Sequence, residues 1–61
     1  MSGMSKILLI EDDVTFSSVL SMSLKSKGYT VEAAHDGIEG LNKAEEFRPD
    51  LIILDVNLPK L

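Results

Sequence analysis

The sequence has little of several things that would define a protein class. It has no cysteine and no tryptophan, and one tyrosine and two phenylalanines are its only aromatic residues. Without cysteine there is no disulfide framework and no thiolate metal site, which fits a reducing compartment. Fully apolar runs such as residues 7–10 are far too short to span a bilayer. No basic stretch followed by an apolar one opens the chain, so a secretory signal is not expected. These absences together predict a cytoplasmic protein without a membrane partner.

Positive charge is also scarce. Six basic residues stand against ten acidic ones, giving a net charge of −4. The basic residues are scattered along the chain, at Lys6, Lys25, Lys27, Lys43, Arg48 and Lys60. A stripe of cations is needed to follow a phosphate backbone, so this segment is not expected to bind nucleic acid.

What is present is a globular composition in a short chain. Hydrophobic residues make up 44% of the 61 positions, which is too many for a disordered segment. A chain of this size buries only about 60% of the surface that its unfolded form exposes, so its stability is marginal. Small domains of this kind usually depend on a metal, a disulfide or a partner chain.

The first half of the sequence alternates between two hydrophobic periods. Residues 7–10 form a continuous apolar run, which is typical of a strand buried on both faces. Asp12 or Asp13 can then cap a helix that Gly28 ends. The apolar stripe of that helix comprises Phe16, Val19, Leu20 and Leu24.

The second half repeats this alternation. Residues 29–34 alternate as a second strand, and residues 35–37 form a turn or cap in which His35 is expected to be exposed. A second helix ends at Arg48, because Pro49 disfavours helical backbone before it. Residues 51–54 are again apolar throughout and predict a third strand. The expected stripe of the second helix is Ile38, Leu41 and Ala44, with Phe47 near its end.

Strands and helices in this order predict an α/β fold with a parallel sheet and right-handed crossovers. The strands of residues 7–10 and 51–54 are apolar enough to be buried on both faces, whereas residues 29–34 are more polar and suit an edge. The expected spatial order is therefore 2-1-3, with strands counted along the chain.

This order brings acidic residues together. Glu11 and Asp12 follow the first strand and Asp55 follows the third, so their side chains should converge where two neighbouring parallel strands end. Such a topological switch point is where open α/β sheets place ligands. Clustered carboxylates repel one another unless a cation is bound, and oxygen ligands of this kind suit Mg²⁺. A carboxylate beside a metal can also accept a phosphoryl group as an acyl phosphate.

Four short motifs follow one another along the chain, in an order and at spacings that are typical of a known protein family. They are KILLIEDD at 6–13, Gly28-Tyr29, AAHDG at 33–37 and PDLIILDVNLP at 49–59. In this combination the chain resembles the first half of a bacterial response-regulator receiver domain, a flavodoxin-like fold of two-component signalling. The resemblance implies a partial receiver domain over residues 6–61, while residues 1–5 are expected to be a frayed end or an expression remnant.

Carried over position by position, the resemblance implies roles for five residues. Asp55 resembles the phosphoacceptor and Asp12 the direct Mg²⁺ ligand. Glu11 resembles the acidic neighbour that holds the metal mainly through water, and Asn57 the residue whose backbone carbonyl completes the site. Asp13 is expected to cap the helix rather than bind metal. The implied protein is a phosphoacceptor and not an enzyme, and its implied partner is a sensor histidine kinase or phosphotransfer protein.

The family pattern also needs a Thr or Ser and a Lys on two further strands, and no residue here can be assigned either role. Without those strands, the edge formed by residues 51–54 would face water. The chain is therefore expected to pair with a second copy through this edge, around a two-fold axis, or with a complementary fragment. The alternative function is a half-receiver assembly or dimerisation module without phosphotransfer. A dinucleotide-binding fold is a weaker alternative, because an acidic turn stands where a glycine-rich one is needed.

Overall fold

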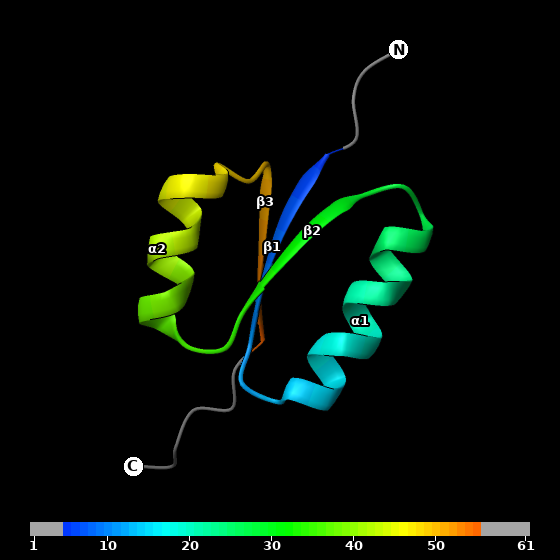
Figure 1. Ribbon diagram of the computed structural model, residues 1–61, viewed down its shortest axis with the longest axis horizontal. Helices are drawn as coiled ribbons and strands as arrows, with labels where there is room; N and C mark the ends of the chain where they lie inside the picture. Colours follow the sequence, from blue (N-terminus) through cyan, green and yellow to red (C-terminus); the bar gives the residue numbers. More distant parts are fainter. Residues whose placement is uncertain (1–4, 56–61) are drawn as a thin grey trace.

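The computed structural model describes the backbone of residues 5–55 and the side chains of residues 5–54. Strand β1 (Lys6–Glu11) is followed by helix α1 (Val14–Ser26), strand β2 (Thr30–Ala34), helix α2 (Gly37–Phe47) and strand β3 (Leu51–Asp55). The three strands form one parallel sheet in the order β2-β1-β3. Figure 1 shows α1 and α2 on opposite sides of this sheet. The α/β class and the strand order 2-1-3 are confirmed.

Helix α1 is defined by a cap at each end. The Asp13 side chain accepts a hydrogen bond from the Phe16 backbone N–H at 3.0 Å, so Asp13 is the N-cap that the sequence indicated. At the other end the N–H groups of Gly28 and Tyr29 donate to the carbonyl oxygens of Lys25 and Leu24. Gly28 has a φ of 99°, which lies in the left-handed region that this closing motif requires. Strand β2 consequently begins at Thr30, one residue later than predicted.

Helix α2 begins with a reciprocal cap. The Asp36 carboxylate accepts from the Glu39 N–H, and the Glu39 carboxylate accepts from the N–H of the exposed His35. The helix ends where Arg48, before Pro49, turns into a left-handed conformation with φ of 55°. The predicted end of the helix is confirmed, although the backbone there is left-handed rather than extended.

The core lies along β1, which is buried from Ile7 to Glu11. On the α2 side of the sheet, Leu8, Ile10 and Ala34 form a buried cluster against which Ala44 and Phe47 pack. Gly40 allows the close approach, since a Cβ atom added there would lie 2.5 Å from Cδ1 of Ile10. Burial of β1 on both faces therefore agrees with its apolar sequence.

The predicted helix stripes are partly wrong. Phe16 and Val19 of α1 are exposed, and Ile38 and Leu41 of α2 are 77% and 66% exposed. Small residues face the sheet instead, with Ser17 buried in α1 and Gly40 buried in α2. A small side chain lets the helix backbone lie close to the strands. The predicted stripes took only apolar residues into account and therefore missed these two positions.

Strand β3 also differs from the sequence-based expectation of burial on both faces. Leu51, Ile52 and Leu54 are each about half exposed or more, at 53%, 48% and 66%. Within the described residues, both helices lie over β1 and β2 and neither lies against β3. The open β3 edge that the sequence indicated is thus present, together with two uncovered faces.

Candidate functional site

The candidate site lies where β1 and β3 both end, at the C-terminal end of the parallel strands, which we call the acidic edge. Glu11 and Asp55 are the last residues of these strands and are direct register partners in the parallel pairing. Neighbouring strands are about 4.8 Å apart, so two carboxylate-bearing residues stand side by side. The sequence-based prediction that Glu11 and Asp55 meet at one sheet edge is confirmed for the backbone.

Glu11 is an unusual residue for the interior of so small a protein. It is 3% exposed, and its Oε2 accepts a hydrogen bond from the Asp13 N–H at 2.9 Å. Charged side chains are rarely buried to this extent unless they are paired or hydrogen-bonded. The buried carboxylate therefore fixes the turn that leads from β1 into α1.

Asp12 and Asp13 have different surroundings within this turn. Asp13 is turned into the helix start, where it caps α1. Asp12 is exposed at the end of the sheet. An acidic side chain that is exposed beside a buried one is well placed to meet a cation arriving from solvent.

Two of the predicted site elements are outside what the structure describes. Asn57 lies beyond the described residues, and Asp55 is described as a strand residue only. Among the described side chains no three His, Cys, Asp or Glu residues converge as a metal-binding group. The chemistry of the donor set nevertheless fits a hard cation, since carboxylate oxygens are the ligands that Mg²⁺ prefers.

Two hydrogen bonds between Asp50 and Lys6, which we call the Asp50 clamp, fix the register of β3 against β1. They lie where these two strands begin, at the other end of the sheet from the site. The Asp50 N–H donates to the Lys6 carbonyl oxygen and the Lys6 N–H donates to the Asp50 carboxylate, both at 2.8 Å. This two-way contact aligns the start of β3 with the start of β1. Five residues further along, the same alignment sets Asp55 beside Glu11.

Sequence reasoning missed this positioning role of Asp50. The available signal was an acidic residue directly before an apolar strand, but its partner, the backbone of Lys6, lies 44 positions away. Lys6 adds a second contact through its ammonium group, which donates to the Phe47 carbonyl and lies 5.4 Å from the centre of the Phe47 ring. The first strand is thereby tied to the end of α2 as well.

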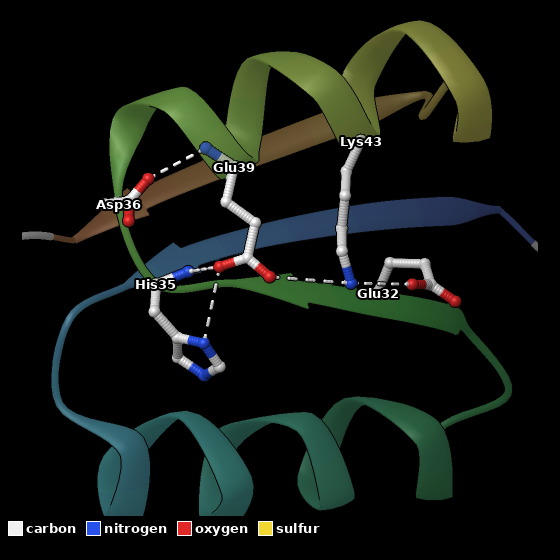
Figure 2. A network of polar contacts seen from close by, with 5 residues as sticks. All are labelled: Glu32, His35, Asp36, Glu39 and Lys43. Atoms are coloured by element: carbon white, nitrogen blue, oxygen red, sulfur yellow. Dashed lines mark hydrogen bonds and ion pairs between the residues drawn. The ribbon is translucent and has the colours of Figure 1, made fainter.

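A polar network joins β2 to α2 on the other flank. Figure 2 shows the Glu39 carboxylate between His35 and Lys43, and the Lys43 ammonium group between Glu39 and Glu32. The Lys43 Nζ to Glu32 Oε1 distance is 3.3 Å, and His35 Nδ1 lies 3.5 Å from Glu39 Oε1. All four side chains are at least one-third exposed. Exposed pairs of this kind contribute little to stability, and their exposure to solvent gives no sign of a second reactive site.

Comparison with known proteins agrees with this geometry. The family model described as "Response regulator receiver domain" matches residues 7–61. The chain belongs to the response-regulator receiver family. The receiver segment is 50% identical over 56 residues to the alkaline phosphatase synthesis transcriptional regulatory protein PhoP of Bacillus subtilis. It is 47% identical over 58 residues to the DNA-binding dual master transcriptional regulator RpaA of a Synechocystis strain.

A solved structure supports the fold of this receiver segment directly. The chemotaxis response regulator CheY4 of Vibrio cholerae matches with a TM-score of 0.84 and 43% sequence identity, over 95% of this chain and 48% of that one. The curated relatives are covered to a smaller extent, with 92% of this chain matching 23% of PhoP. The receiver segment therefore spans about half of the CheY4 chain and about a quarter of PhoP.

Neither helix within residues 5–55 combines the length and apolar character needed to cross a membrane. The expectation for residues 1–5 falls mostly outside the described residues and stays a prediction. A receiver domain is a signalling module of response regulators.

Proposed function

We propose that this receiver segment supplies the phosphoacceptor of a two-component phosphorelay, with Asp55 as the residue that is phosphorylated. The pairing of Asp55 with Glu11 in register is the observation that carries the proposal. In the transfer, a carboxylate oxygen of Asp55 forms a bond to phosphorus while the P–N bond to the donor's histidine breaks. The imidazole leaves with the electron pair of that bond, and an acyl phosphate remains.

We assign Mg²⁺ binding to the same edge. Asp12, Asp55 and the backbone carbonyl of Asn57 would hold the ion directly, and Glu11 mainly through water. When bound, Mg²⁺ would offset the charge that accumulates as an anionic phosphodonor approaches carboxylates. Glu11 has a second task that needs no metal, because its hydrogen bond to the Asp13 N–H keeps the turn closed and Asp12 at the sheet edge.

The remaining assignments follow from the same proposal. The donor is a sensor histidine kinase or phosphotransfer protein in the cytoplasm, and the chain acts as an acceptor rather than as an enzyme. No residue among these 61 is assigned the hydroxyl or lysine role that the family pattern includes. The β3 edge is available to a second strand, from another copy or from a complementary fragment.

Phosphorylation by a small donor tests the proposal. The chain is incubated with acetyl phosphate and Mg²⁺, and its intact mass is measured. We expect a species heavier by one phosphoryl group that is absent without Mg²⁺ and absent in Asp55→Asn. Glu46→Gln is a matched control, because it removes one negative charge from an exposed residue of α2 and not from the strand ends that carry Glu11 and Asp55. A modified species that persists in Asp55→Asn, or no modified species with wild-type chain, would contradict the proposal.

A further inference from the structure

Strand β3 is apolar on both of its faces, so its register against β1 is weakly specified by side chains. All four residues from Leu51 to Leu54 are leucine or isoleucine, and so are their register partners, residues 7–10 of β1. Leu51 and Ile52 alternate between opposite faces of the sheet, yet they are 53% and 48% exposed. A shift of β3 by one residue would therefore exchange apolar side chains for apolar ones, with little change in burial.

Such a shift would displace the proposed phosphoacceptor. In the observed register Asp55 is the partner of Glu11, and register partners in a parallel pair share one face of the sheet. A one-residue shift would move Asp55 by about 3.3 Å along the sheet, to a position beside residue 12 or residue 10. Because neighbouring positions of a strand belong to opposite faces, Asp55 would no longer share a face with Glu11.

The polar residues at the two ends of this strand pair act on the register in opposite directions. At the acidic edge Glu11 and Asp55 are both acidic, and like charges on neighbouring strands disfavour the pairing unless a cation is bound. At the other end, the two hydrogen bonds of the Asp50 clamp, each 2.8 Å long, require that Asp50 stand beside Lys6. The Asp50 clamp thus favours the register that the charges of the acidic edge disfavour.

We infer that Asp50 is a positioning residue for the phosphorylation of Asp55. Its clamp with the Lys6 backbone favours the register that sets the acceptor beside Glu11. Asp50 directly precedes β3, so it acts through the strand and not by contact with the phosphodonor. The inference rests on the proposed function for its effect on phosphorylation, whereas the register can be measured whether or not Asp55 is phosphorylated.

Nuclear Overhauser contacts between methyl groups measure the register directly. In the observed register Leu9 shares a face with its partner Ile53, whereas a one-residue shift would bring Leu9 beside Ile52 or Leu54. The carboxylate of Asp50 accepts one hydrogen bond, and its loss in Asp50→Ala should raise the ratio of shifted to observed register by about fivefold. The same ratio in Asp50→Ala and in the wild-type chain would overturn the inference.

Two further variants distinguish positioning from overall stability. The initial rate of phosphorylation by acetyl phosphate with Mg²⁺ is divided by the folded fraction from circular dichroism. For Asp50→Ala this rate should fall in proportion to the loss of the observed register. Asp50→Asn should restore both the rate and the register, because its amide oxygen can still accept from the Lys6 N–H. Gly40→Ala overpacks α2 against Ile10 and should lower stability without changing either quantity.

The two measurements fail separately. A shifted register in Asp50→Ala, together with a wild-type chain that is not phosphorylated, would defeat only the proposed function. A phosphorylated wild-type chain, together with an unchanged rate per folded molecule in Asp50→Ala, would defeat only the present inference. An equal fall of that rate in Asp50→Ala and Gly40→Ala would also defeat it, because Asp50 would then act on stability alone.

Discussion

At the scale of single residues, close contacts decide where helix α2 can lie. Gly40 is buried against Ile10, and a Cβ atom there would come within 2.9 Å of both Cγ1 and Cδ1 of that side chain. Ile10 is itself 8% exposed, so it has little room to move aside. The position of α2 on the sheet thus depends on the absence of one methyl group.

We expect Gly40→Ala to lower the free energy of unfolding by about 1–3 kcal/mol, because overpacking in a filled core forces side chains or the helix to shift. Gly37→Ala is the control, since a Cβ atom there meets nothing within 4 Å and alanine favours a helix. Urea unfolding followed by circular dichroism measures both. A Gly40→Ala variant as stable as Gly37→Ala would show that the close packing is not present in solution.

Asp50 offers a second test at this scale. Its carboxylate accepts from the Lys6 N–H at 2.8 Å, so Asp50→Ala should destabilise the fold by about 0.5–1.5 kcal/mol. Hydrogen exchange of the β3 amides should accelerate more than that of β2, because the clamp joins β1 to β3. Equal acceleration in both strands would mean that Asp50 acts on overall stability and not on β3 register.

At the scale of elements, helix α1 depends on its ends more than on its composition. It contains five serines among 13 residues, and serine is a mediocre helix former. Its caps therefore carry a larger share of its stability. The Asp13 N–H also donates a hydrogen bond to the carboxylate of the site residue Glu11, so the cap and the acidic edge are built from one turn.

We expect Asp13→Ala to cost about 0.5–2 kcal/mol of stability through the lost N-cap. Asp13→Asn should retain most of the stability that the N-cap provides, because an asparagine oxygen can also accept from the Phe16 N–H. Thermal unfolding of the two variants measures the difference. If both variants lose the same stability, the charge of Asp13 matters rather than its cap.

Sequence patterns predicted the order of the helices and strands correctly, but they predicted only in part which side of each helix packs against the sheet. The apolar run of β1, the cap at Asp13 and the stop at Gly28 are local signals, so the order of elements could be read directly. Which helix face meets the sheet depends on tertiary packing, and there Ser17 and Gly40 replaced the expected apolar residues. The pairing of Glu11 with Asp55 followed from strand order, whereas the Asp50 clamp depends on the register found only in three dimensions.

At the scale of the whole molecule, the acidic edge should link folding to metal binding. A ligand that binds only the folded chain stabilises it, by about 2.7 kcal/mol at a free concentration one hundred times the Kd. We expect MgCl₂ to raise the urea midpoint of the wild-type chain beyond the effect of NaCl at equal ionic strength. Asp12→Asn and Asp55→Asn should lose most of this gain. An equal gain in both variants would place any Mg²⁺ effect away from this edge.

The central position of β1 has a consequence for the order in which the molecule is assembled. Strand β1 is synthesised before both of its neighbours, since β2 begins at Thr30 and β3 at Leu51. A nascent chain therefore carries an apolar strand with both edges unpaired until β2 emerges, and with one edge unpaired until β3 emerges. Translation speed between these two strands sets how long that edge is open to aggregation or to chaperones.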